Sequence, residues 1–237
     1  MLAQSRPRPW TGWRWLVHLL LLAGAFLAAS AGAQPRERLI WALGDSLTAG
    51  YGLPPAQGYT AQLQAALRSR GVNAVVRNGG VSGDTTRQGL ARLRWGLRGL
   101  PRTPDLVIVE LGANDMLRGL PVPQAEANLD AILTELRARR IPVLLAGMRA
   151  APNLGPEYRA QFDGIYPRLA QRHRVPLYPF FMDGVAGQRQ LIQGDGLHPN
   201  AAGVRVIVAR IIPHVVRALN SRAALQLSPR APRLALR

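Results

Sequence analysis

The chain of 237 residues contains no cysteine, and none of its 30 basic residues is lysine. Without cysteine the protein has no disulfide, no thiol nucleophile and no thiolate metal site, so its stability depends on a hydrophobic core. Acidic residues are also few: 13 aspartates and glutamates oppose the 30 arginines, which leaves a formal net charge of +17 at pH 7. The length suits one domain with a sizeable core.

The surplus of arginine raises the question of a polyanionic partner. Guanidinium groups pair with phosphate, so a charge of this size can attract nucleic acid or an anionic membrane. The arginines are distributed over every segment of the chain instead of forming one basic stripe. We therefore predict a small-molecule substrate and no specific nucleic-acid partner, while a weak association with anionic lipid surfaces stays open. We expect a monomer.

The first 33 residues have the layout of a secretory signal peptide. Arginines precede the apolar run 16–29, and small residues ending at Ala33 follow it. The run is shorter than the roughly 20 residues that a membrane-spanning helix needs. We predict cleavage near Ala33 and export of the mature protein to the periplasm or the medium. Residues 34–220 then form the domain, and 221–237, with several arginines and few core candidates, form a basic and flexible tail.

Strand-like and helix-like segments alternate along the domain. The predicted strands are 40–43, 73–76, 105–111, 141–146 and 175–180. The predicted helices are 57–70, 85–98, 123–140, 156–172 and 201–219. The strand 105–111 lacks an alternation of polar and apolar residues, which favours cover on both faces. This order predicts an α/β fold with right-handed crossovers, in which a ligand binds at the carboxyl ends of parallel strands.

A candidate nucleophile stands where the first predicted strand ends. The apolar run 40–43 stops at Gly44-Asp45-Ser46, so a buried strand would deliver the hydroxyl of Ser46 to a loop. The same three residue types are common in ordinary turns, so this stretch alone does not establish catalysis. A serine hydroxyl also needs a base, usually a histidine that is oriented by a carboxylate.

Among the four histidines, His198 is the candidate base. It lies in the turn-rich segment 194–200 with a carboxylate three positions earlier, at Asp195, so one loop can present the base and its orienting group. The segment also has the pattern of a helix start with Asn200 as the N-cap, and the two interpretations are compatible. The other three histidines are better explained by an apolar leader, a basic helix and the last apolar helix: His18, His173 and His214.

Four short blocks carry a resemblance to a known family. They are Gly44-Asp45-Ser46-Leu47, Gly83-Asp84, Gly112-Ala113-Asn114-Asp115 and Asp195-x-x-His198. In composition and order they resemble the four blocks of the SGNH (GDSL) hydrolases, and the similarity extends over residues 39–219. Segments 81–86, 88–93 and 175–182 are similar to the bacterial periplasmic thioesterase/lysophospholipase/arylesterase enzymes. Ala113 is a departure, because some of these relatives are expected to have a second glycine there.

The resemblance implies a three-layer α/β/α fold, flavodoxin-like, with five parallel strands in the order 2-1-3-4-5. It also implies roles for residues at matching positions. Ser46 would attack an acyl carbonyl, His198 would act as the base and Asp195 would orient it. The oxyanion hole would consist of the backbone N–H groups of Ser46 and Gly83 and the side-chain amide of Asn114. No cofactor and no metal are expected.

We therefore predict an exported serine hydrolase that cleaves acyl esters and thioesters, of the arylesterase, acyl-CoA thioesterase or lysophospholipase type. Three alternatives stay open. One is a carbohydrate esterase of the same family that removes acetyl groups. Another is a basic protein that keeps the fold and binds lipid or nucleic acid without turnover. The last is a metal site formed by Asp45, Asp195 and His198, although no further histidine or cysteine joins them.

Overall fold

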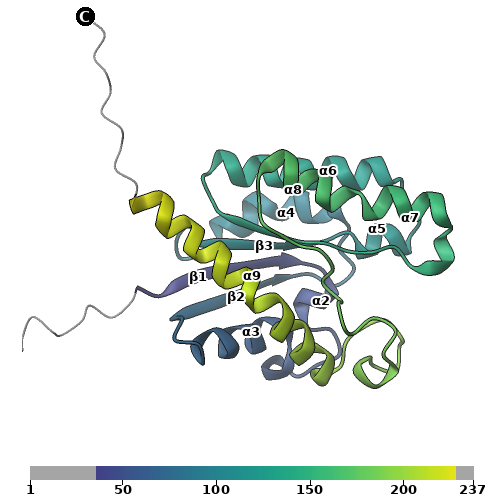
Figure 1. Ribbon diagram of the computed structural model, residues 1–237, viewed down its shortest axis with the longest axis horizontal. Coiled ribbons are helices and arrows are strands. Elements are labelled where there is room, and N and C mark those ends of the chain that lie inside the picture. Colours follow the sequence, from purple (N-terminus) through teal and green to yellow (C-terminus); the bar gives the residue numbers. More distant parts are fainter. Residues whose placement is uncertain (1–35, 228–237) are drawn as a thin grey trace, which may run out of the picture. The chain divides into compact units, whose positions relative to one another are not determined.

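The computed structural model describes residues 36–227, with side chains described up to residue 220 (Figure 1). The predicted signal peptide and residues 228–237 lie outside this range. The strands are β1 (Arg38–Gly44), β2 (Ala74–Gly80), β3 (Leu106–Glu110), β4 (Val143–Ala146) and β5 (Leu177–Tyr178). The α-helices are α2 (Ser46–Ala49), α3 (Tyr59–Arg68), α4 (Thr86–Arg98), α5 (Ala113–Leu117), α6 (Val122–Ala138), α7 (Pro156–Asp163), α8 (Ile165–His173) and α9 (Ala201–Leu227).

The five strands form one parallel sheet in the order β2-β1-β3-β4-β5, which confirms the predicted topology. Their last residues are in register, because Gly44 of β1 pairs with Gly80 of β2 and with Glu110 of β3. The loops that follow these three strands therefore leave the sheet at the same edge. Three of the four sequence blocks begin there, as expected for a ligand site at the carboxyl ends of parallel strands.

Helices cover both faces of the sheet (Figure 1). On one face α3 packs against α9, and on the other α6 packs between α4 and α8. Every residue of β3 is buried, in agreement with the apolar run Leu106–Val109 that precedes Glu110. The buried residues of α6 recur every three or four positions, the spacing of one helix face: Val122, Ala125, Leu129, Ile132, Leu133 and Leu136.

Three boundaries differ from the sequence prediction. The segment predicted as one helix over 156–172 is two helices, α7 and α8, which meet at Gly164. The last strand is only two residues long, because the prolines on both sides of Leu177–Tyr178 cannot donate to a ladder. Helix α9 ends at Leu227 instead of 219, so the segment 221–227, predicted as the start of the tail, is helical. In these places tertiary packing and proline, and not the apolar periodicity of the sequence, determine where the helices and strands end.

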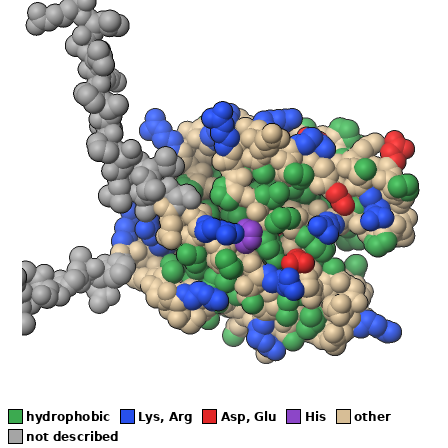
Figure 2. All heavy atoms as spheres, viewed as in Figure 1, with side chains coloured by type: hydrophobic (Ala, Val, Ile, Leu, Met, Phe, Trp, Pro, Cys, Tyr) green, Lys and Arg blue, Asp and Glu red, His purple; other side chains and the backbone are tan. Residues whose placement is uncertain are grey.

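Basic side chains are scattered over the face drawn in Figure 2, among apolar and uncharged groups, and acidic side chains are few there. No basic stripe is visible on this face, which agrees with the even distribution of arginine along the sequence. Several arginines pair with acids on neighbouring helices, as in Arg168 with Glu126 and Arg94 with Glu135. Such exposed pairs contribute little to stability. None of the helices described here is long and apolar enough to cross a membrane.

Candidate active site

Ser46 lies at the first turn after β1, and the turn is fixed from two sides. The carboxylate of Asp45 caps α2 by accepting the backbone N–H of Leu47 at 3.0 Å. Gly44 must be a glycine, because a Cβ there would collide with the side chains of Thr48 and Glu110. The short helix therefore presents the Ser46 hydroxyl at the carboxyl edge of the sheet.

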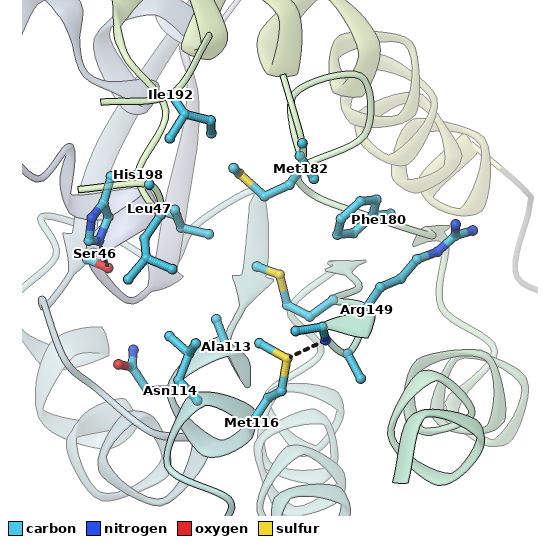
Figure 3. Close-up of a pocket in the computed structure, with 18 of the residues that line it drawn as sticks. Ser46, Leu47, Ala113, Asn114, Met116, Arg149, Phe180, Met182, Ile192 and His198 are labelled. Carbon is cyan, nitrogen blue, oxygen red and sulfur yellow. Dashed lines mark hydrogen bonds between the residues drawn. The ribbon is translucent and has the colours of Figure 1, made fainter. Parts of the chain in front are cut away.

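The loop before α9 brings the predicted base to this hydroxyl. Nε2 of His198 lies 2.8 Å from Oγ of Ser46 (Figure 3). Nδ1 of the same ring lies 2.6 Å from Oδ2 of Asp195. With Nδ1–H donated to the carboxylate, Nε2 is left as the free base that faces the serine. The structure thus brings Ser46, His198 and Asp195 into one hydrogen-bonded chain although 152 positions separate the first two.

The loop itself is held by Asp195 and by its neighbours. The other carboxylate oxygen of Asp195 accepts the backbone N–H groups of Leu197 and His198 at 2.9 and 3.0 Å. These two N–H groups, with the His198 ring, lower the pKa of Asp195 to about 2. Asp195 is therefore ionised at neutral pH and can stabilise an imidazolium. Asn200 caps the start of α9, as predicted, because its side-chain oxygen accepts the backbone N–H groups of Ala202 and Gly203 at 3.0 Å.

Ser46, Gly83 and Asn114, which supply the candidate oxyanion donors, all line the same pocket. Gly83 has a φ of +86°, a left-handed conformation that favours glycine, and its carbonyl is held by Arg118 at 2.7 Å. Within the described residues, no acceptor is paired with the backbone N–H of Ser46 or Gly83. The amide of Asn114 donates to Oδ2 of Asp45 at 3.2 Å and to the carbonyl of Asp84 at 3.0 Å. A bound oxyanion would therefore have to accept the N–H that Asn114 donates to Asp45, the longer of these two hydrogen bonds.

Glu110, the last residue of β3, was not among the predicted site residues, yet it lies directly behind the nucleophile turn. It is fully buried, and its Oε2 accepts the hydroxyl of Thr48 at 2.7 Å. Its other carboxyl oxygen has no hydrogen-bond partner among the described residues. Burial, and then the charge of Asp45, raise the pKa of Glu110 well above its ordinary value. Burial also raises the pKa of Asp45 to about 6.

These buried carboxyl groups predict a pH dependence of stability. A carboxyl group with a raised folded-state pKa is neutral in the folded protein at pH values where the unfolded chain is ionised. Unfolding then releases a proton, so the free energy of unfolding should fall as the pH rises from about 4, the ordinary carboxyl value, through 6. Glu110→Gln keeps the size of the side chain and should flatten this slope. Thermal unfolding over this pH range measures it, and equal slopes would contradict the assignment.

An apolar pocket of about 710 Å³ opens from Ser46 and His198. Figure 3 shows the apolar side chains that separate the catalytic candidates from Arg149, which lies at the opposite end. The larger apolar side chains of the lining that are buried or half-buried are Leu47, Met116, Met148, Phe180, Met182 and Ile192. The lining contains three of the four methionines of the chain, whose flexible side chains adapt to ligands of different shape.

Within the described part of the chain, no three His, Asp or Glu side chains are grouped so that they could hold a metal ion. Asp45, Asp195 and His198 are thus not such a group. The carboxylate of Asp45 instead accepts hydrogen bonds from Leu47 and Asn114. The geometry gives the metal-site alternative no support.

Fold and site together define a hydrolase of the α/β class with serine, histidine and aspartate in hydrogen-bond contact. Residues 42–206 match the sequence profile of the GDSL-like Lipase/Acylhydrolase family. The chain belongs to this family.

Relatives with a high degree of sequence identity are named as esterases or thioesterases. The chain is 41% identical over 184 residues to the Arylesterase of Vibrio mimicus, covering 78% of this chain and 90% of the relative. It is 41% identical over 188 residues to the Thioesterase 1/protease 1/lysophospholipase L1 of Escherichia coli (strain K12), covering 79% and 85%. The solved structure of AlinE4, an SGNH-hydrolase family esterase, matches with 51% identity and a TM-score of 0.67, covering 79% and 99%. The protein is an esterase or thioesterase of the SGNH family.

Proposed function

We propose that the chain is an exported serine hydrolase that cleaves acyl esters and thioesters through an acyl-enzyme intermediate. The observation that carries this proposal is the chain of hydrogen bonds from Asp195 through His198 to Ser46, at the mouth of an apolar pocket. The names of the relatives support substrates of the arylesterase, thioesterase and lysophospholipase types.

In the proposed reaction, Oγ of Ser46 attacks the acyl carbonyl while Nε2 of His198 takes its proton. The negative charge moves to the carbonyl oxygen, where the N–H groups of Ser46, Gly83 and Asn114 stabilise it. When the tetrahedral intermediate collapses, the imidazolium returns the proton to the departing alcohol or thiol. Water then attacks the acyl-enzyme while His198 takes its proton. When this second intermediate collapses, the bond from Oγ of Ser46 to the acyl carbon breaks, the imidazolium returns the proton to Oγ, and the carboxylic acid leaves. Asp195 keeps the imidazole in one tautomer throughout.

Export is the second part of the proposal. It rests on the run 16–29 and the small residues up to Ala33, which lie outside the described residues. We expect the mature protein, recovered from the periplasm or the medium of an expressing bacterium, to begin close to Gln34. N-terminal sequencing measures the cleavage site directly.

The size and composition of the pocket favour an acyl chain over an acetyl group. A pocket of about 710 Å³ with a mostly aliphatic lining gains from each methylene that it buries. A carbohydrate acetyl esterase needs little such volume and would need polar groups for the sugar. Likewise, a protein that binds without turnover has no use for a serine, an imidazole and a carboxylate in hydrogen-bond contact.

Acyl-chain profiling is the test of the proposed substrate class. We expect kcat/KM for p-nitrophenyl esters to rise by up to about fourfold for each methylene, and to level off when the pocket is full. The same profile should hold for acyl thioesters and should not change with chelator. An optimum at the acetyl ester would favour the carbohydrate esterase instead.

A pocket variant provides the matched control for this profile. Phe180 lines the pocket close to Arg149, away from Ser46 (Figure 3). Phe180→Ala should move the optimum toward longer acyl chains and leave the rate with the acetyl ester close to that of the wild type. If both rates fall together, the far end of the pocket does not receive the acyl chain.

A further inference from the structure

Exposed apolar side chains gather around the mouth of the pocket. Tyr51, Leu117 and Leu197 are 52%, 54% and 52% exposed, and all three line the pocket. Val81 is 45% exposed and is adjacent in sequence to the lining. We call these four residues the apolar rim. They come from four separate segments, so the fold and not a local sequence pattern brings them to one site. Among the side chains that the structure describes, Trp95 is the other large apolar one with high exposure.

The charged side chains that line the pocket have one sign, although the carboxylate of Asp195 lies beside Leu197. Arg149 and Arg159 line the pocket, and no aspartate or glutamate is part of the lining. Neither arginine is ion-paired within the described part of the chain. The guanidinium of Arg149 lies over the ring of Phe180, 5.4 Å from its centre. Arg118 adds a third positive charge near the rim, where it holds the carbonyl of Gly83.

Apolar side chains that remain exposed together commonly mark a binding surface. Leucine and tyrosine together with arginines on the same pocket are a combination that suits the interface of an anionic lipid assembly, where apolar groups enter the acyl boundary and guanidinium groups pair with phosphates. Here Arg118 follows Leu117, and Arg149 lies at the other end of the pocket from His198. A second copy of this chain fits less well, because it would bring Arg149 and Arg159 of both copies together in a protein with a net charge of +17.

We propose that the apolar rim docks on the surface of an anionic lipid assembly, with Arg149 and Arg159 toward the phosphates. In this orientation the mouth of the pocket faces the lipid, so an acyl chain can enter it without crossing water. This docking deepens the proposed function. Only the entry of an acyl chain into the pocket rests on that function, and the docking itself does not. Its charge complementarity selects an anionic surface over a zwitterionic one.

Co-sedimentation with vesicles tests the docking without turnover. The full chain is used in a Ser46→Ala background, so no lipid is consumed and binding does not depend on the proposed chemistry. Vesicles contain phosphatidylcholine alone, or phosphatidylcholine partly replaced by phosphatidylglycerol. We expect binding to the anionic vesicles only, weakened by at least about tenfold in Leu117→Ser/Leu197→Ser. Arg149→Gln/Arg159→Gln should lose about tenfold at low salt and less at high salt.

Trp95→Ser is the matched control, because Trp95 is 73% exposed but lies on α4, nine residues and about 14 Å beyond the turn that borders the site. Trp95→Ser should bind the vesicles as tightly as its parent, the Ser46→Ala chain. All variants have the same termini, and their melting temperatures should be similar. Equal binding by the rim variants would overturn the proposal, as would an equal loss in Trp95→Ser. Equal affinity for both kinds of vesicle would also overturn it, and so would a concentration-dependent dimer that the leucine substitutions dissociate.

Discussion

Ser46→Ala and His198→Ala are each expected to lower kcat by at least about 10³, while the melting temperature stays close to that of the wild type. Both side chains belong to one hydrogen-bonded unit, with 2.8 Å between Oγ of Ser46 and Nε2 of His198. Removal of the hydroxyl leaves no nucleophile, and removal of the imidazole leaves no base. The double variant should therefore be about as slow as either single variant. Steady-state kinetics with a p-nitrophenyl ester measures all three.

Two substitutions of the same kinds elsewhere serve as controls. The hydroxyl of Ser69, at the end of α3, donates to the carbonyl of Ala66, and the ring of His214 packs 5.0 Å from that of Tyr178. Ser69→Ala and His214→Ala should keep most of the turnover. An organophosphonate should label the wild type once, at Ser46, and should fail to label Ser46→Ala. Near-native turnover by either site variant would rule out the proposed mechanism.

The fold could be predicted because its signals are local. The apolar strand 105–111, the glycines after the strands and the helix-period segments each appear within a short window of sequence. Helix α4 begins at a capping box with the sequence pattern Thr85-x-x-Gln88, in which the two residues hydrogen-bond each other's backbone. The site candidates could be found for the same reason, because each stands directly after a strand or in a turn-rich loop.

The rest of the site has no local signal. Glu110 is one polar residue at the end of an apolar strand, and nothing near it in sequence shows that it lies opposite Gly44 in the sheet. The pocket is lined from separate segments, so residues such as Met148 and Ile192 cannot be recognised as lining before the chain is folded. The apolar rim was missed for the same reason, since single exposed apolar residues are common on protein surfaces.

Asn114→Ala is expected to lower kcat by about 10² to 10³ with little change in KM. In the oxyanion role, the amide of Asn114 donates to a charge that exists only near the transition state. The amide also has a structural use, because it links Asp45 of the first block to the carbonyl of Asp84 in the second. Kinetics alone therefore cannot separate the two roles, and thermal unfolding of the same variant is needed.

Asp115→Asn is the matched control, one residue further along α5. The carboxylate of Asp115 is buried and accepts both the backbone N–H and the hydroxyl of Thr86, at 2.8 and 2.7 Å. Its loss should lower the melting temperature more than kcat, because those bonds hold the start of α4 and face no reacting atom. Asn114→Ala should thus lower mainly kcat, whereas Asp115→Asn should lower mainly the melting temperature. If Asn114→Ala is destabilised but keeps its kcat below the melting temperature, Asn114 is a structural residue and the backbone N–H groups of Ser46 and Gly83 must hold the oxyanion alone.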